Sequence, residues 1–319
     1  MKHLRILNYV DEVARSGSIR RAAERLNVTA SAVNRRIADL EDELGAPLFD
    51  RRPRGVRLTA AGEFFVRYLR GNMGEAERMK SQIEDLKGLR RGTVRIACSQ
   101  ALALHFLPQQ IAEFRKTHPL VSFDLKVADH QWAMAAVAAY EVDLVIVFRP
   151  NFLANFQPLM TLEQELVAVM AEDHPLAARK TLRLSDCAAY PIAMPERSIG
   201  GRQLLEDVFS RTGLTFKIAA ESNSFEMLRG LVMQAGLISF QIKIGTLPPG
   251  NKLGVIAREI DGRDVPRANL VIGHLRGRNL PIATAVFAET IVRQLEAMRG
   301  VKSESPRGGA RPARKPEMA

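Results

Sequence analysis

Apolar residues recur at helical spacing between positions 18 and 59, and their pattern predicts two short helices joined by a tight turn. The first helix is expected to begin at Ser18, whose hydroxyl can cap backbone N–H groups, and to run through Leu26. The second is expected to begin near residues 29–31 and to end at Gly45, because a residue without Cβ adopts the left-handed stop without strain. Such a pair is a helix-turn-helix, in which the second helix enters the major groove of DNA.

The outward face of the second predicted helix carries polar side chains suited to reading bases. Val33, Ile37 and Leu40 form its apolar face, so Asn34 and Arg35 are expected to face outward. Asn pairs with adenine and Arg with guanine, while hydroxyls contact phosphates or bases. The Arg-rich segment after this helix predicts a hairpin wing against the phosphate backbone. The predicted DNA-binding residues are Ser18, Arg20, Thr29, Ala30, Ser31, Asn34, Arg35, Arg36, Arg52, Arg54 and Arg57.

A further helix is predicted before this unit, over residues 2–15, and a long one after it, from Thr59 to about Gly88. Apolar positions in the long helix alternate spacings of four and three, which is the seam of a coiled coil with one polar residue to fix its register. We therefore expect a homodimer through residues 59–88, extended to a homotetramer, that binds an inverted repeat in double-stranded DNA. The alternative is a monomeric helix packed on its own domain. The seam comprises Phe65, Leu69, Asn72, Ala76, Met79, Ile83 and Leu86.

The N-terminal stretch resembles the winged helix-turn-helix of LysR-type transcriptional regulators. Ala30 and Asn34 depart from the family, which usually has Gln and Ser there, so the operator sequence is not carried over. The resemblance implies a DNA-binding transcription regulator, with RNA polymerase as a further partner if the protein is an activator. The matching residues are Gly17-Ser18, Ala22-Ala23, Leu26, Ser31-Ala32-Val33, Arg35, Ile37, Leu40-Glu41, Leu44-Gly45, Leu48-Phe49, Arg51, Leu58-Thr59 and Gly62.

After the hinge GLRRG, strands alternate with helices, which predicts a parallel sheet covered on both faces. This half is similar to the effector domain of the same family, and the similarity implies two α/β lobes like those of periplasmic binding proteins, with a small ligand between them. The fold class is therefore α/β. The similarity rests on Gly92-Thr93, Pro108, Phe114, Pro119, Asp143-Leu144, His174-Pro175-Leu176 and Ala235-Gly236. The expected units are a winged helix-turn-helix at 1–58, a linker helix and hinge at 59–91, an effector domain at 92–300 and a disordered basic tail at 301–319; lobe I spans about 92–161 and 267–300, and lobe II about 162–266.

Polar residues at strand ends and before helices mark the expected effector site, because helix N-termini there present N–H groups and partial positive charge. Hydroxyl, amide and guanidinium groups suit a carboxylate or another anion. Ser99, Ser222 and Ser224 have an alternative role as ordinary N-caps, and Arg149 has an alternative role in a surface salt bridge. The predicted effector-binding residues are Ser99, Gln100, Arg149, Ser198, Ser222, Asn223 and Gln241.

Charge and the remaining motifs narrow the function. The formal net charge is +11, and the first 91 residues hold 19 Lys and Arg against 13 Asp and Glu, as expected if this part meets a polyanion. No metal-ligand spacing joins the two Cys or the six His, so no metal or cofactor is expected. With no bilayer-spanning apolar run and no secretion signal, we expect a cytoplasmic protein without a membrane partner.

Two other functions are alternatives. The first is an enzyme on an α/β scaffold, for example a hydrolase that uses Ser99 or Cys98, but the sequence has no GxSxG elbow, P-loop or dinucleotide fingerprint. The second is an architectural DNA-binding protein whose C-terminal half only oligomerises. We expect a regulator rather than an enzyme.

Overall fold

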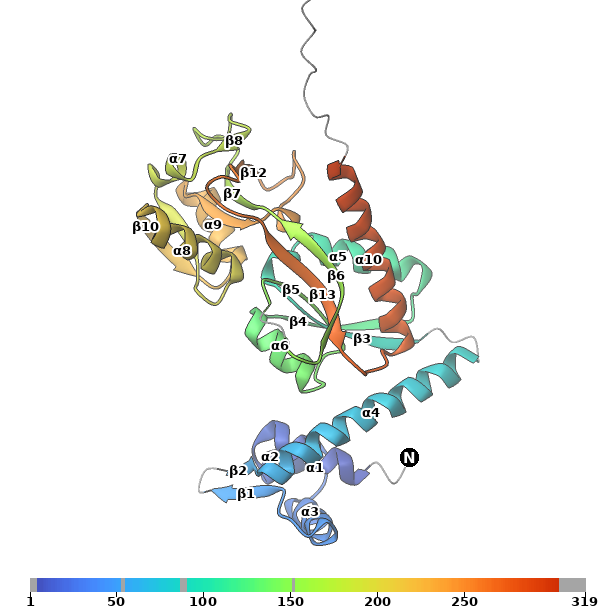
Figure 1. The fold of residues 1–319 in the computed structure, drawn as a ribbon. Helices are drawn as coiled ribbons and strands as arrows, with labels where there is room; N and C mark the ends of the chain where they lie inside the picture. The colour runs from blue at the N-terminus through green and yellow to red at the C-terminus, as the bar shows by residue number, and fades with distance from the viewer. Residues whose placement is uncertain (1–4, 53–54, 87–90, 151–152, 304–319) are drawn as a thin grey trace, which may run out of the picture.

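The computed structural model describes residues 5–52, 55–86, 91–150 and 153–303. Its N-terminal unit is the predicted winged helix-turn-helix (Figure 1). Ser18 caps the second helix by accepting a hydrogen bond from the Arg21 N–H, and Thr29 caps the third through the Ala32 N–H. Gly45 ends the third helix at a φ of 66°. The elements are α1 (Arg5–Ser16), α2 (Ile19–Arg25), α3 (Ala30–Leu44), β1 (Phe49–Arg52), β2 (Gly55–Leu58) and α4 (Ala60–Leu86).

The coiled-coil seam predicted on α4 is wrong in its first half. Leu69 is fully buried in the core of the winged helix-turn-helix, and Phe65 packs against the same core. The aromatic residues that α4 exposes are instead Phe64 and Tyr68, whose exposed fractions are 71% and 69%. In the second half, Met79 and Ile83 are exposed as a seam requires, and Leu86 is in a part of α4 whose side chains lie outside the described residues. The dimer itself stays a prediction.

Lobe I is built on a five-stranded sheet in the order β4-β3-β5-β13-β6. The first three of these strands are parallel, but β13 is antiparallel to both of its neighbours, so the sheet is mixed rather than parallel as predicted. Helices cover both faces, and β6 and β13 run on toward the second lobe (Figure 1). The elements are β3 (Gly92–Cys98), η2 (Gln100–Leu102), α5 (Phe106–Thr117), β4 (Val121–Val127), α6 (His130–Ala138), β5 (Leu144–Phe148), β6 (Phe156–Gln164), β13 (Ala268–Leu275) and α10 (Ile282–Ser303).

Lobe II holds a four-stranded sheet in the order β11-β7-β12-β8 and a separate parallel pair, β9 with β10. One apolar cluster extends through both lobes and includes Ile96, Phe148, Met170, Phe240 and Phe287. The elements are β7 (Leu166–Ala171), β8 (Thr181–Leu182), α7 (Leu184–Ala188), β9 (Ile192–Pro195), α8 (Gly200–Thr212), β10 (Ile218–Ser222), α9 (Phe225–Ala235), β11 (Ser239–Ile242), η3 (Lys243–Gly245) and β12 (Val255–Ile260).

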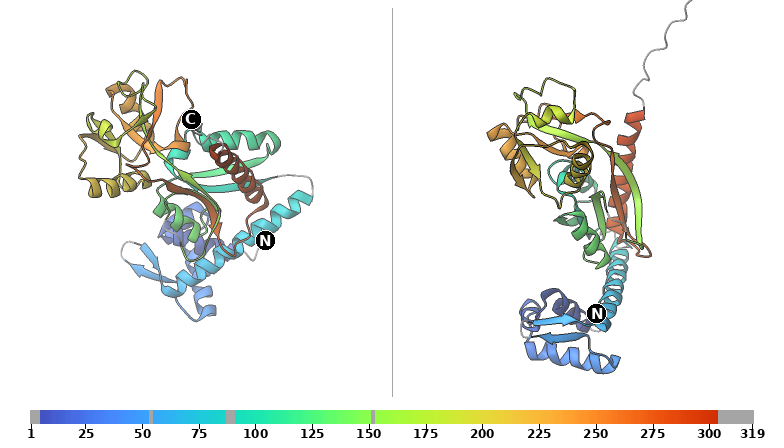
Figure 2. Two further views of the ribbon diagram at one scale, coloured as in Figure 1. Left: turned by 45° about the horizontal axis from the view of Figure 1, so that its top comes forward. Right: turned by 60° about the vertical axis from the view of Figure 1, so that its left-hand side comes forward.

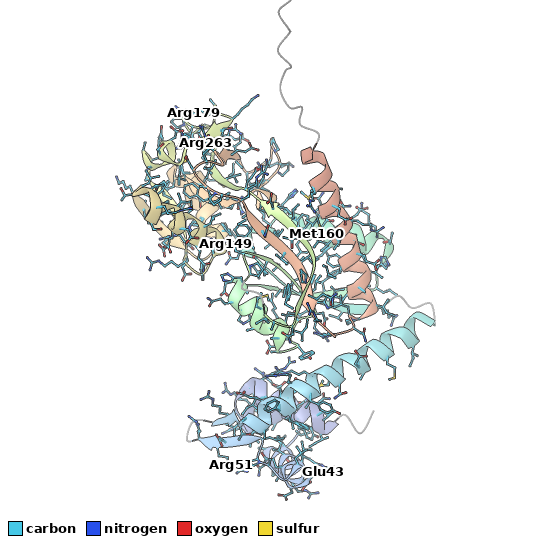
Figure 3. The ribbon with its side chains drawn as sticks, viewed as in Figure 1. Glu43, Arg51, Arg149, Met160, Arg179 and Arg263 are labelled. Carbon is cyan, nitrogen blue, oxygen red and sulfur yellow. The ribbon has the colours of Figure 1, made fainter. Side chains whose placement is uncertain are left out.

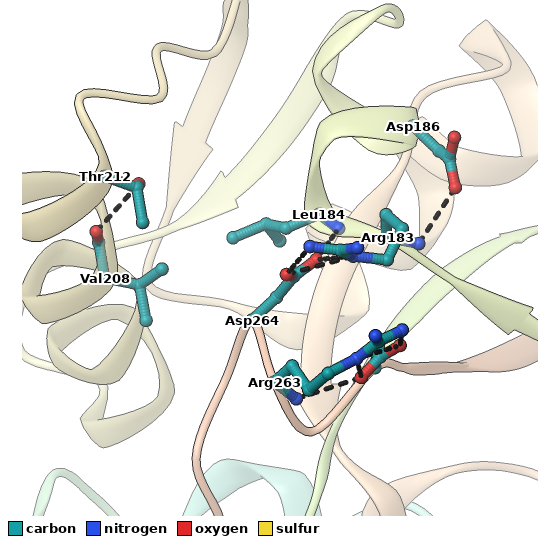
Figure 4. A network of polar contacts seen from close by, with 8 residues as sticks. Arg183, Leu184, Asp186, Val208, Thr212, Arg263 and Asp264 are labelled. Carbon is teal, nitrogen blue, oxygen red and sulfur yellow. Dashed lines mark hydrogen bonds and ion pairs between the residues drawn. The ribbon is translucent and has the colours of Figure 1, made fainter.

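An arginine–aspartate network fixes the loop after β12 to the start of α7 (Figure 4). The Arg183 guanidinium donates to both oxygens of Asp264, from Nε at 2.8 Å and from Nη2 at 2.5 Å, and the Leu184 N–H donates to the same carboxylate at 2.7 Å. Beside it, Arg263 donates from Nε to Oδ1 and from Nη2 to Oδ2 of Asp261, which makes a second bidentate pair. These bonds keep the Asp264 pKa below its ordinary value, with the Arg183 hydrogen bonds as the largest cause.

The two views of Figure 2 show the winged helix-turn-helix on one side of the two lobes, with α4 between them. Among the described residues, no helix is long and apolar enough to cross a membrane. Most of the predicted tail, residues 304–319, lies outside the described residues.

Candidate DNA-binding surface and effector cavity

The N-terminal half of α3 presents the expected side chains to solvent. Ala30, Ser31, Arg35 and Arg36 are exposed, while Val33 and Ile37 are buried in the core beneath them. The helix phase therefore matches the predicted reading face.

Asn34 departs from this pattern. It is half-buried, and its Oδ1 accepts a hydrogen bond of 2.9 Å from Nη2 of Arg51 on β1. Its amide is therefore partly occupied in holding the wing against α3, a role that its position on the helix did not reveal. Arg51, which was not among the predicted site residues, lies on the same side of the unit as Glu43 (Figure 3).

The wing is held in place by Glu41. Its Oε1 accepts from the N–H groups of Leu48 and Phe49, at 2.6 and 3.1 Å, which fixes the first hairpin strand relative to α3. Arg52 and Arg57 are exposed on the two strands, as predicted. Arg54 lies outside the described residues.

The remaining predicted DNA contacts lie at helix starts. Thr29 and Ser18 both use their hydroxyls as N-caps, and Thr29 Oγ1 is also 3.1 Å from the hydroxyl of Ser31. Arg20 is exposed, with its Nε 3.5 Å from the Glu24 carboxylate. The structure thus gives Ser18 and Thr29 a structural role, whatever phosphate contact they add.

Five of the seven predicted effector residues meet at one cavity of about 190 Å³ between the lobes. They come from both lobes: Ser99 and Gln100 follow β3, while the other three lie on lobe II segments. The lining also includes Gly200 and Gly201, and three residues that the sequence reasoning missed, Asp129, His130 and Phe148. The five predicted residues at the cavity are Ser99, Gln100, Ser198, Asn223 and Gln241.

Four helices begin at this cavity, because the first residues of η2, α6, α8 and α9 all line it. Helix N-termini carry N–H groups without intrahelical partners and a partial positive charge, which favour an anion. The start of α8 is the most open of the longer helices, since its N-cap residue Ile199 makes no side-chain cap bond. A side chain would fit tightly there, because a Cβ on Gly200 would lie 3.0 Å from the Phe148 carbonyl oxygen.

The cavity has no cationic Lys or Arg side chain among the lining residues that the structure describes. Its two titratable residues are neighbours in sequence. Asp129 already caps α6 by accepting from the Trp132 N–H at 2.8 Å. His130 is only 2% exposed, and its Nδ1 has no hydrogen-bond partner among the described residues. Desolvation by burial lowers the His130 pKa, Arg149 lowers it further and Asp129 opposes the shift, so the ring is neutral near pH 7.

Gln100 closes the cavity by joining the lobes. Its Oε1 accepts from the Phe225 N–H at 3.0 Å, and its Nε2 donates to the Asn223 carbonyl. Ser99 Oγ accepts from the Phe148 N–H at 3.0 Å, which ties β3 to β5. Gln241 is buried, and its Nε2 is 3.4 Å from the Gly245 carbonyl oxygen.

Two predicted effector residues are not at the cavity. Ser222 Oγ instead accepts from the Ser224 N–H and shapes the loop before α9. This local hydrogen bond is similar to the N-cap role expected as its alternative. Arg149 has a left-handed backbone with a φ of 51°, and its N–H donates to the Asn269 carbonyl at 2.8 Å. This turn sends its guanidinium to Asp207 of α8, 3.0 Å away, where the two lobes meet (Figure 3). The structure therefore shows the salt bridge of the alternative role for Arg149, and its contact with an effector stays a prediction.

The groups proposed for a hydrolase are not arranged for catalysis. Cys98 is fully buried, and burial raises its pKa to about 12, so the nucleophilic thiolate is not formed near neutral pH. Ser99 and His130 share the cavity, but Asp129 accepts from the backbone and His130 Nδ1 has no partner within the described part of the chain, so the relay of a Ser-His-Asp triad is not formed there. Within the described residues, no group of three or more His, Cys, Asp or Glu could hold a metal ion.

Comparisons with known proteins cover both units. The family described as "Bacterial regulatory helix-turn-helix protein, lysR family" matches residues 4–63, and "LysR substrate binding domain" matches residues 87–296. The RuBisCO operon transcriptional regulator of Allochromatium vinosum is 29% identical over 299 residues, which are 92% of this chain and 97% of that protein.

Two solved structures show the same fold. A full-length OxyR variant from Pseudomonas aeruginosa matches with a TM-score of 0.68 and 20% identity, over 90% of this chain and 93% of that chain. The regulatory domain of CcmR from Synechocystis matches with a TM-score of 0.53 and 23% identity, over 65% of this chain and 97% of that chain. The first likeness covers most of the chain, and the second covers the part that a regulatory domain alone spans.

Proposed function

We propose that this chain, which belongs to the LysR family of bacterial helix-turn-helix regulators, binds an inverted-repeat promoter site as a homodimer and responds to a small anionic effector. The observation that carries the proposal is the pairing of an exposed α3 face with a cavity between two lobes in one chain. Neither an enzyme nor a purely architectural protein accounts for both. Since promoters lie in the cytoplasm of a bacterium, we place the protein there.

For DNA, we assign base contacts to Arg35 and Arg36, with Ala30 and Ser31 close to the groove, because these residues are exposed on the N-terminal half of α3. Arg52 and Arg57 on the wing, with Arg54 at its tip, are assigned to phosphates. Asn34 would read a base only with the amide group that Arg51 leaves available. RNA polymerase joins this list of partners if the bound protein activates transcription.

For assembly, the exposed stripe of α4 supports a dimer through residues 59–88. Phe64, Tyr68 and Met79 lie on one side of the helix, since their spacings of four and eleven residues are close to whole turns. A second apolar surface, with Leu104, Val127 and Met233 about 40 to 50% exposed, gives the additional contact that a tetramer needs. Two α3 helices related by a two-fold axis would then read half-sites about one helical turn apart.

For the effector, the N-termini of α6, α8 and α9 at a cavity without Lys or Arg support a small anion held by backbone N–H groups and by Ser, Asn and Gln side chains. A carboxylate fits these donors and the volume of about 190 Å³. The CcmR regulatory domain was solved in complex with 2-PG, so one protein of this fold takes a ligand of small size.

The experiment that tests this function is a genome-wide DNA pull-down with the purified chain, with and without a panel of small carboxylates. We expect enrichment of a few promoters that share an inverted repeat, and a change in recovered fragments or footprint length with one carboxylate. Equal recovery of native promoters and scrambled DNA at moderate salt would contradict the proposal.

A further inference from the structure

We propose that helix α6 transmits occupancy of the effector cavity to the DNA-binding unit through Arg70. This inference rests on the proposed function, because it describes how the same cavity is coupled to DNA binding. Helix α6 begins at the cavity, and the residue that follows it, Ala139, is bonded to Arg70 of α4. Figure 1 shows α6 on the side of lobe I that faces α4 and the winged helix-turn-helix.

The N-terminal end of α6 is open to a ligand. Asp129 and His130 both line the cavity, and His130 is a buried side chain whose Nδ1 has no partner among the described residues. An anion in the cavity competes with the Asp129 carboxylate for the first N–H groups of the helix, since both are attracted to the same helix end. Occupancy therefore acts directly on the position and stability of the first turn of α6.

The C-terminal end of α6 meets one guanidinium that also holds the DNA-binding unit together. Arg70 Nη1 donates to the Ala139 carbonyl at 2.9 Å and lies 3.9 Å from Glu141 Oε1. Its Nε donates at 2.6 Å to Oδ1 of Asp11, a residue of α1 that is only 6% exposed. The Arg70 side chain is 12% exposed, so these bonds are largely shielded from water. A shift of Ala139 thus pulls on the contact between α1 and α4.

The turn after α6 packs closely against both α4 and lobe I. Tyr140 has a left-handed backbone with a φ of 58°, and a Cβ added to Gly71 of α4 would lie 3.8 Å from the Tyr140 hydroxyl. The Arg278 guanidinium lies 5.2 Å above the Tyr140 ring and also donates to the Val142 carbonyl. The turn after α6 is therefore held by lobe I on one side and by α4 on the other.

The body of α6 suits movement as one piece. Its buried residues Ala133, Met134, Ala136 and Val137 pack in a cluster with Val145 and Val147 of β5 and Val271 of β13. Nine residues span about 13 Å, and small side chains at a helix–sheet contact allow the sliding of a fraction of a turn that packed elements use in shear motions. Helices α8 and α9 also begin at the cavity, but both end within lobe II.

Hydrogen–deuterium exchange of the full-length protein tests the coupling without DNA or effector. Asp129→Ala removes the cap of α6, and exchange in α6 should become about fivefold faster. The coupling predicts that residues 60–73 of α4 and residues 5–16 of α1 also exchange faster, by about twofold to fivefold. The matched control is Ser224→Ala, which removes the cap of α9 at the same cavity and should leave α1 and α4 unchanged.

The second arm removes the link itself. In Arg70→Lys, one ammonium near Asp11 cannot also reproduce the guanidinium bond to the Ala139 carbonyl. Adding Asp129→Ala to Arg70→Lys should then give no further change in α4, whereas adding it to Arg67→Lys, an exposed neighbour on the same helix, should give the full effect. Should Asp129→Ala open lobe I as a whole, Asp129→Gly supplies a milder loss of the same cap.

Two outcomes would overturn the coupling. One is an equal response of α4 to Asp129→Ala and Ser224→Ala, which would indicate general loosening of the cavity. The other is an undiminished response in the Arg70→Lys background, which would indicate another route. Because hydrogen exchange is measured on the unliganded protein without DNA, its result does not depend on the result of the promoter pull-down.

Discussion

Neighbouring residues on α4 separate the domain core from the proposed dimer seam. Leu69 is fully buried among the side chains of the winged helix-turn-helix, while the side chain of Tyr68 is 69% exposed. Replacing each by Ala removes a large apolar group from the same turn of the same helix. Only the surface that loses the group differs between the two variants.

The expected magnitudes follow from burial. Leu69→Ala should destabilise the winged helix-turn-helix by about 2–5 kcal/mol, the range for truncating a fully buried Leu. Tyr68→Ala should change the stability of one isolated chain by less than about 0.5 kcal/mol. If Tyr68 anchors the seam with about 2 kcal/mol from each protomer, the dimer Kd rises by roughly a thousandfold, because two copies lose the contact.

Two measurements on the full chain distinguish these effects. Hydrogen exchange of residues 5–58 reports the stability of the core, and sedimentation velocity over a range of concentrations reports the dimer. We expect Leu69→Ala to accelerate exchange and Tyr68→Ala to shift the protein toward monomer with normal exchange. The assignment of the two faces is refuted if Tyr68→Ala sediments like the parent protein, or if Leu69→Ala dissociates the dimer with its core intact.

Three further predictions concern DNA, the cavity and acid stability. Arg35→Ala should weaken binding to the promoter by about 1–3 kcal/mol and leave random DNA less affected, whereas Arg57→Ala should weaken both alike; equal losses for Arg35→Ala in a filter-binding assay would contradict its role. Gly200→Val should abolish the melting-temperature shift produced by an effector while DNA binding persists, because a Cβ there lies 3.0 Å from a carbonyl oxygen; a retained shift would place the effector elsewhere. Because Arg183 lowers the Asp264 pKa, that pair stabilises lobe II above pH 4 and its contribution is lost as pH falls below about 4. Urea unfolding of Asp264→Asn should therefore show a weaker dependence on pH below 4 than the parent protein, and an identical slope would exclude this pair as the cause.

The winged helix-turn-helix was predictable because its signals are local. Ser18, Thr29 and Gly45 begin and end helices through contacts within a few residues, and the apolar spacing between them fixes which face is buried. The exception is Asn34, whose partner Arg51 is 17 residues away in the sequence. A polar side chain on the outward face of the recognition helix is therefore free to contact DNA only if no residue of a neighbouring strand hydrogen-bonds to it.

The cavity was predictable in part. Strand ends and helix starts pointed to Ser99, Gln100 and Asn223, since ligands of α/β sheets gather at the carboxyl ends of strands. Arg149 follows the same rule but is directed elsewhere by a φ of 51°, which depends on its bond to Asn269 across the sheet. His130 was missed because nothing in its neighbourhood distinguishes it from an ordinary helix residue. Its importance comes from the distant segments that enclose it.

The linker helix shows why periodicity alone could not assign its faces. The apolar residues of α4 cover a broad arc, with Leu69 toward its own domain and Tyr68 outward, one residue and about 100° apart. A seam can be drawn along either stripe, because Phe64 and Tyr68 are four residues apart, as are Phe65 and Leu69. What decides between them is the packing of α1 and β2 against α4, which covers the stripe through Leu69 and leaves the aromatic one exposed. Substitutions along this helix therefore have to be sorted by burial, since loss of DNA binding follows both from a loosened core and from a dissociated dimer.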